Sequence, residues 1–191
     1  MSEASLFKKI SVTGAHSSCG KTTLASILLK NIAGFGAIKF TRTSLHTSVT
    51  DDPGEIMQKS KDTAILSESG AEHVVWIQSP AENLKDALQV AVSKLGHLRG
   101  IVVEGNSPVD YLDPDLVIFV IGEEGRIKPS AERVSKRADV VVVNTDKDPC
   151  ELPFLSSLGQ EKAKIFQIDL MHKTGEIDKF IAYVKKYISG L

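Results

Sequence analysis

The chain has 191 residues, of which 42% are hydrophobic and 25% are charged, with a formal net charge of -1. This composition suits a globular protein with one buried core and gives no electrostatic reason to expect a nucleic acid or a membrane surface as partner. The two cysteines, Cys19 and Cys150, make no disulfide framework, and the first ten residues lack the apolar core of a signal peptide. We therefore expect a cytoplasmic protein and a single domain spanning residues 1–191.

Apolar segments rich in β-branched residues alternate with segments of helical period along the whole chain. The expected strands cover 10–14, 37–40, 73–78, 100–105, 115–122, 139–145 and 163–170. The expected helices cover 21–34, 56–69, 83–98, 128–137 and 175–189, the last being a packing helix without chemistry. Such alternation predicts an α/β fold, a doubly wound and mostly parallel sheet of about seven strands with ligands at the carboxyl ends of the strands.

The connection at 41–55, "TRTSLHTSVTDDPGE", has neither helical nor strand period and contains a Pro-Gly turn. Structureless connections of this length are uncommon in compact domains. We interpret it as a mobile loop, which is either a lid or switch segment or simply disordered. In the first case Asp51 or Asp52 could approach a bound metal ion when the loop closes.

The segment "VTGAHSSCGKTTLASILL", residues 12–29, joins the first expected strand to the first expected helix. Glycines at its turns let backbone N–H groups point at phosphate oxygens, a lysine reaches the terminal phosphates, and a threonine hydroxyl coordinates Mg²⁺. The expected nucleotide-contacting residues are Gly14, Ala15, His16, Ser17, Ser18, Cys19, Gly20, Lys21, Thr22 and Thr23. The alternative is a strand-to-helix turn with a solvated lysine. Cys19 is either a functional thiol or loop packing, and His16 either faces the ligand or is solvated.

A carboxylate for the metal is expected at the tip of the strand "IVVEG", where Glu104 precedes Gly105. Together with Thr22 it would hold Mg²⁺ directly or through water. A surface glutamate is the alternative interpretation. Asp51 is the second carboxylate that we expect at the metal, and Asp62 could play the same part or lie on a helix surface.

The segment "VVNTDKD" resembles a guanine-recognition motif that has lost its lysine, because Thr145 stands at the lysine position. Asn144 and Asp146 are expected to lie against the base, with Asp146 and Asp148 on either side of the usual aspartate position. The nucleotide is therefore GTP or ATP, and the pattern leaves the choice open.

Several of these segments resemble the family of molybdopterin-guanine dinucleotide biosynthesis protein B. The similar segments are Gly-Lys-Thr-Thr-Leu at 20–24, Ile-Lys at 38–39, the run from Lys61 to Trp76, and Val-Glu-Gly at 103–105, over roughly residues 8–122. The resemblance implies a magnesium-dependent accessory GTPase of molybdenum-cofactor biosynthesis that works with a partner protein, and a homodimer is one arrangement it allows.

Dethiobiotin synthetase is the rival resemblance, since its phosphate loop also encloses five residues between the glycines and its strand also ends in Glu-Gly. That likeness implies an ATP-dependent synthetase in which Lys39, beside Lys21, acts near the substrate. A maturation-factor GTPase similar to the nickel-enzyme accessory proteins is a third reading. Lys39, Arg42 and Lys61 could attract an anionic substrate or form an ordinary solvated face, and Trp76 fills core or lid space or stacks on a base.

Overall fold

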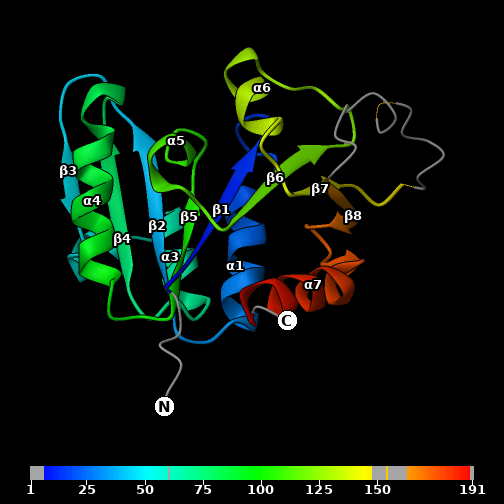
Figure 1. The fold of residues 1–191 in the computed structure, drawn as a ribbon, viewed down its shortest axis with the longest axis horizontal. Helices are drawn as coiled ribbons and strands as arrows, with labels where there is room; N and C mark the ends of the chain where they lie inside the picture. Colours follow the sequence, from blue (N-terminus) through cyan, green and yellow to red (C-terminus); the bar gives the residue numbers. More distant parts are fainter. Residues whose placement is uncertain (1–6, 60, 148–153, 155–162, 190–191) are drawn as a thin grey trace.

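The computed structural model describes residues 7–59, 61–147, 154 and 163–189, and Figure 1 shows their arrangement. The strands are β1 (Lys8–Gly14), β2 (Phe35–Arg42), β3 (Ser48–Thr50), β4 (Val74–Ser79), β5 (Gly100–Glu104), β6 (Leu116–Gly122), β7 (Val140–Asn144), β8 (Lys164–Asp169) and β9 (Thr174–Gly175). The helices are α1 (Lys21–Asn31), α2 (Pro53–Ile56), α3 (Asp62–Glu68), α4 (Leu84–Leu95), α5 (Val109–Leu112), α6 (Pro129–Ser135) and α7 (Ile177–Ser189), with a 3-10 turn at Ala81–Asn83. No helix in the described ranges is long and apolar enough to cross a membrane.

The strands of the described residues form one sheet in the order β3-β4-β2-β5-β1-β6-β7-β8-β9. All neighbouring pairs from β4 to β8 are parallel, and only the edge strands β3 and β9 run antiparallel. The α/β class and the mostly parallel sheet expected from the sequence are confirmed, and the seven expected strands are the seven parallel ones. Figure 1 shows β1 in the middle of the sheet, so both its neighbours, β5 and β6, bring their carboxyl ends to the same edge as β1.

Helices cover both faces of the sheet, which explains why the inner strands are apolar on both faces. Along β5 the side chain of Val102 packs in one core cluster with α1 and α7, whereas Ile101 and Val103 pack in another with α4. A third cluster joins β6 and β7 to α6. The alternation places Glu104 on the same face as Val102, toward α1.

The connection at 41–55 is not the structureless loop that we expected. Ser48–Thr50 forms β3 and pairs with β4, and α2 begins at Pro53, where the Asp52 carboxylate accepts a hydrogen bond from the Glu55 N–H (3.2 Å). A strand of three residues is too short to show a period in the sequence. The helix expected at 56–69 is also corrected, since α2 and α3 are separate short helices.

Strands from the first and last thirds of the chain share this sheet, and on that basis we propose that the chain forms a single domain. The strand expected to begin at residue 163 matches β8, which begins at Lys164. The helix expected from 175 begins at Ile177 because Thr174–Gly175 pairs with β8 as β9. Cys150 and Asp148 lie outside the described residues.

The core predicts a large effect of truncating Phe119, which is fully buried in β6 opposite Thr13 of β1. Phe119→Ala should lower the free energy of unfolding by about 3–5 kcal/mol, because it removes buried ring area and leaves a cavity. Urea denaturation would measure this. Leu45→Ala is the matched control, as Leu45 is 91% exposed and its loss should change stability by less than about 0.5 kcal/mol. Equal effects of the two substitutions would contradict the packing described.

Candidate functional site

The loop between β1 and α1 is held in a tight turn that requires its two glycines. Gly20 has φ 107°, a conformation that favours glycine, and Ser18 also lies in the left-handed region at φ 61°. A Cβ atom at Gly14 would lie 2.4 Å from the Cys19 sulfur. These constraints explain the spacing of the glycines in the sequence.

The amino end of α1 has the features of an anion site. Its cap residue, Gly20, supplies no side-chain hydrogen bond, and no acidic residue occupies its first turn. The free N–H groups and the helix dipole therefore face the pocket with no acidic residue of the helix itself to offset them, and Ser17 and Ser18 of the loop are exposed there. The loop geometry suits a phosphate group.

Lys21 arches back over the loop. Its ammonium donates a hydrogen bond to the His16 carbonyl oxygen (2.9 Å) and lies 3.9 Å from the Cys19 sulfur. Cys19 is 2% exposed and belongs to the core cluster beneath the loop, which supports its packing role. The half-buried His16 uses its Nδ1 atom locally, 2.6 Å from the Ser17 carbonyl oxygen.

Glu104 stands at the centre of a chain of polar contacts beside the loop. The Thr22 hydroxyl donates to its Oε2 atom (3.0 Å), and the Lys39 ammonium lies 2.6 Å from its Oε1 atom. Lys39 also pairs with Asp62 at 2.5 Å, from the start of α3. The strand register places Glu104 opposite both Val12 of β1 and Lys39 of β2, so the sheet itself brings these groups together.

The charges of Glu104, Lys39 and Asp62 in this set of polar contacts leave room for a cation. Burial lowers the pKa of Lys39, but the carboxylates of Glu104 and Asp62 outweigh burial and hold its pKa above the usual value, so the ammonium stays charged at neutral pH. Among these three groups, two carboxylates against one ammonium leave one negative charge in excess, while Lys21 and Arg42 make the wall of the pocket as a whole positive. Glu104 is only 2% exposed. Its carboxylate oxygens and the Thr22 hydroxyl oxygen are the hard oxygen ligands that Mg²⁺ prefers.

This oxygen set fits a magnesium ion that is also held by phosphate oxygens, the usual arrangement for Mg²⁺ with a nucleotide. In the part of the chain that the structure describes, no group of three or more His, Cys, Asp or Glu side chains is arranged to hold a metal ion.

Two asparagines brace the loop. The side chain of Asn106 accepts a hydrogen bond from the Gly14 N–H and donates one to the Gly14 carbonyl, both at 2.9 Å. Asn144 donates to the Cys19 carbonyl (3.3 Å) and accepts from the Leu170 N–H (3.0 Å). Asn144, which was expected at the base, contacts the loop itself, and its contact with a base stays a prediction. Asn106 was not expected at all, and its place two residues after Glu104 was the only signal available.

Asp146 lies exposed beyond the end of β7 and does not contact the loop through any hydrogen bond or ion pair among the described residues. Thr145, at the lysine position of the guanine motif, is buried, and its hydroxyl accepts a hydrogen bond from the Lys147 N–H (3.0 Å). Asn144 therefore lies against the loop, whereas Asp146 faces solvent.

A pocket of about 630 Å³ opens in front of the loop. Its lining residues come from the loop and α1, from β2, from α3 and from the tip of β5, and they are Ser17, Ser18, Gly20, Lys21, Thr22, Thr23, Lys39, Phe40, Thr41, Arg42, Asp62, Ile65 and Glu104. Three further residues expected at the nucleotide, Gly14, Ala15 and His16, line an adjoining hollow of about 270 Å³ that shares Lys21 and Arg42 with the pocket. Ala15 itself is fully buried. Cys19, Asn144 and Asp146 line neither cavity, whereas the other loop residues border one connected region together with Lys39.

The expected role of Asp51 at the metal is wrong. Asp51 follows β3, and the sheet order places β4 and β2 between it and Glu104, a lateral distance of about 14 Å at ordinary strand spacing. Its carboxylate pairs with Lys94 of α4 (3.0 Å) and with His73 (3.1 Å), on the face of the sheet away from α1. Asp62, which we weighed as an alternative, is the aspartate that reaches the site.

Comparison with known proteins shows a likeness of fold. No family model and no curated protein matches the chain. Among solved structures, it is similar to the hydrogenase maturation factor HypB from Archaeoglobus fulgidus, with 16% identity and a TM-score of 0.65 over 96% of this chain and 91% of that one. It is also similar to HypB from Helicobacter pylori in complex with nickel, with 12% identity and a TM-score of 0.60 over 97% and 89%. The chain has the fold of P-loop NTPases.

The contacts of Asp51 predict a role in stability and none in metal binding. Its hydrogen bond with Lys94 lowers its pKa, and His73 adds to the effect. A lowered pKa in the folded state contributes stability above the unfolded-state value of about 4, and this is lost as pH falls through the folded-state pKa. Asp51→Asn should therefore cost about 0.2–1 kcal/mol at pH 7 and progressively less below about pH 4.

Urea denaturation across this pH range measures the effect, with Glu72→Gln, an exposed change outside the helices and strands, as control. Magnesium-dependent nucleotide affinity should stay the same in Asp51→Asn. A clear loss of that affinity would indicate that Asp51 binds the metal and would contradict its assignment to the ion pairs with Lys94 and His73.

Proposed function

We propose that this protein binds a purine nucleoside triphosphate together with Mg²⁺ and acts as a nucleotide-dependent accessory protein in the maturation of another protein. The observation that carries the proposal is the 3.0 Å contact between Thr22 and Glu104, which are 82 residues apart. It joins the first turn of the anion-binding helix to a buried carboxylate at the adjacent strand tip. This combination is what a magnesium–phosphate complex needs.

In this proposal the N–H groups from His16 to Thr23 surround the phosphates, and Lys21 leaves the His16 carbonyl to pair with the terminal phosphate, while the Ala15 N–H stays bonded to the Val120 carbonyl (2.8 Å). Thr22 and Glu104 would hold Mg²⁺, with Asp62 close enough to act through water. The ion would neutralise charge on the phosphate oxygens. Asn106 and Asn144 keep the loop in the conformation that receives the phosphates.

The base would lie toward the carboxyl ends of β7 and β8, where Asn144 and Asp146 are found. GTP and ATP are both retained as candidates, because Thr145 supplies no lysine stem against the base. GTP is the choice that agrees with the family resemblance of residues 8–122.

The finer role that we propose is an accessory GTPase of molybdenum-cofactor biosynthesis, working with a partner protein in the cytoplasm, either alone or as a homodimer. The name of one similar solved structure, a hydrogenase maturation factor, supports the broader maturation role. The segments at 20–24 and 61–76, which resemble the family of molybdopterin-guanine dinucleotide biosynthesis protein B, support the role in molybdenum-cofactor biosynthesis.

A synthetase of the dethiobiotin type is the second candidate, favoured by the position of Lys39 beside the phosphate loop. The ion pairs of Lys39 with Glu104 and Asp62 already balance its positive charge. Contact between Lys39 and an anionic substrate would require its ammonium to leave at least one of these carboxylates. Analysis of products after incubation with Mg²⁺, each triphosphate and candidate second substrates separates the two classes. Both would release diphosphate and inorganic phosphate, but only a synthetase would also convert the second substrate.

The first test removes the lysine of the loop. Lys21→Ala should weaken triphosphate binding by about ten- to a hundredfold, because a charged hydrogen-bond donor to the phosphates is lost. The fold should be unaffected, as the side chain is only half-buried and has no carboxylate partner among the described residues. Calorimetric titration measures the affinity. Lys30→Ala, an exposed lysine at the other end of α1, is the matched control, and equal affinities of the two variants would rule out the phosphate site.

The second test removes the charge of the metal carboxylate while keeping its size. Glu104→Gln should lower magnesium-dependent triphosphate binding by about one to two orders of magnitude, equivalent to roughly 1.4–2.7 kcal/mol. The affinity for the triphosphate without metal should stay the same or rise slightly, since Lys39 then pairs with one carboxylate instead of two. Titrations in Mg²⁺ and in EDTA compare the two, with Glu68→Gln on the exposed face of α3 as control. Equal losses in both conditions would make Glu104 a structural residue.

A further inference from the structure

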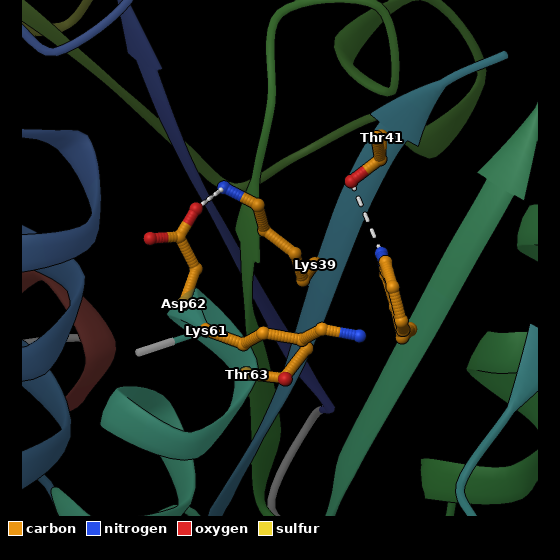
Figure 2. Close-up of a pocket in the computed structure, with 6 residues that line it drawn as sticks. Lys39, Thr41, Lys61, Asp62 and Thr63 are labelled. Atoms are coloured by element: carbon orange, nitrogen blue, oxygen red, sulfur yellow. Dashed lines mark hydrogen bonds and ion pairs between the residues drawn. The ribbon is translucent and has the colours of Figure 1, made fainter. Parts of the chain in front are cut away.

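Beside the nucleotide pocket lies a second hollow that the proposed function does not use. It has a volume of about 280 Å³ and is lined by Lys39, Thr41, Lys61, Asp62, Thr63 and Trp76, as Figure 2 shows. Lys39, Thr41 and Asp62 also line the nucleotide pocket, so the two cavities share a wall. This second hollow, the Trp76 pocket, therefore opens next to the groups assigned to Mg²⁺ and the terminal phosphate.

An indole ring in a fixed orientation forms one wall of the Trp76 pocket. Trp76 lies on β4, and its Nε1–H donates a hydrogen bond to the Thr41 hydroxyl of β2 at 3.0 Å. The side chain is partly buried against the core cluster of α1 and only partly covered by protein. A flat apolar surface held in place by a hydrogen bond is suited to pack against a ring of a bound molecule.

The free positive charge of the Trp76 pocket belongs to Lys61. Its ammonium lies 4.5 Å from the centre of the Trp76 ring, and no carboxylate among the described residues pairs with it. Lys39, in contrast, is already balanced by two carboxylates. A cation over an aromatic ring at a partly exposed site gains only about 0.5–1 kcal/mol, whereas a hydrogen bond to a charged group is worth about 1.5–3 kcal/mol. An incoming anion would therefore draw Lys61 off the ring and free the ring face.

We propose that the Trp76 pocket binds a second ligand, a small molecule with a flat ring and a carboxylate or phosphate group, at the same time as the nucleotide. Its ring packs on Trp76 and its anionic group pairs with Lys61. The volume suits a ligand at the small end of the usual range, of one or two rings. This inference rests on the proposed function in one respect, the assignment of the adjoining pocket to the nucleotide.

The test uses the single tryptophan of the chain, because Trp76 is the only one among 191 residues and its fluorescence reports directly on the pocket. Phenyl phosphate, a flat ring with an anionic group, is titrated into the full-length protein, and phenol serves as the uncharged probe. We expect a saturable change in emission and protection from iodide quenching with phenyl phosphate and at least tenfold weaker binding of phenol. Because the phosphate loop could also bind the phosphate of this probe, the titration without nucleotide counts for the Trp76 pocket only where the substitution of Lys61 weakens it.

The variants isolate the charge that is invoked. Lys61→Ala should weaken phenyl phosphate binding by about tenfold, and Lys61→Gln, which keeps most of the stem, should do the same. Lys85→Ala, an exposed lysine on α4, removes the same charge elsewhere and should leave the binding unchanged. Absence of saturable binding, or equal effects of Lys61→Ala and Lys85→Ala, would overturn the proposal.

A second titration, monitored by calorimetry with Mg²⁺ and a non-hydrolysable triphosphate, separates the two proposals. Binding of phenyl phosphate that persists at saturating nucleotide supports a second ligand site. Displacement of phenyl phosphate by the nucleotide would show that Trp76 belongs to the nucleotide site and would overturn the inference. If phenyl phosphate binds but no triphosphate does, the proposed function fails while the Trp76 pocket stands as an anion site.

Discussion

The arrangement of this protein's site depends on the burial of one carboxylate, that of Glu104, which is 2% exposed in the middle of the sheet. A carboxylate removed from water is strongly destabilising unless it is paired and hydrogen-bonded. Lys39 from the strand on one side and Thr22 from the helix that follows the strand on the other side satisfy it. The pairing of β2 with β5 is therefore favoured by the charge as well as by the packing, since it places Lys39 opposite Glu104.

The same constraint shapes the phosphate loop. Thr22 can reach Glu104 only if α1 begins directly after Gly20, and this requires the turn that Asn106 and Asn144 hold from its two sides. The loop is thus fixed by Asn106, two residues beyond the end of β5, and by Asn144 at the end of β7. In the sheet, β5 and β7 lie on either side of the pair β1 and β6. Lys39 also connects Glu104 to α3 through its ion pair with Asp62. We therefore expect a change at the metal position to alter the contacts of α3 and of the Trp76 pocket, which Lys39 and Asp62 also line.

Much of this could be predicted because the signals were local. Uninterrupted β-branched runs such as "DVVVVN" identified the inner strands, and the glycines, Lys21 and Thr22 identified the loop. Glu104 was placed correctly beside Thr22 because a residue at the end of one parallel strand must lie near the end of the next. The parts that the sequence could not give depend on pairings between distant segments. The three residues of β3 are too few to show a period, so we expected Asp51 in a mobile loop. In the structure Asp51 follows the antiparallel strand β3 and pairs with Lys94 of α4, on the face of the sheet away from α1. The bonds of Asn106 to Gly14 and of Lys39 to Asp62 are set by side-chain direction alone.

The central claim is that the pocket in front of the loop receives a triphosphate and a magnesium ion as a unit. Isothermal titration calorimetry of the unmodified protein with non-hydrolysable analogues of GTP and ATP, each in Mg²⁺ and in EDTA, tests it most directly. The account predicts that at least one analogue binds with one site per chain and that Mg²⁺ tightens this binding by at least tenfold. Absence of binding by both analogues at millimolar concentration, or the same affinity in Mg²⁺ and in EDTA, would contradict it.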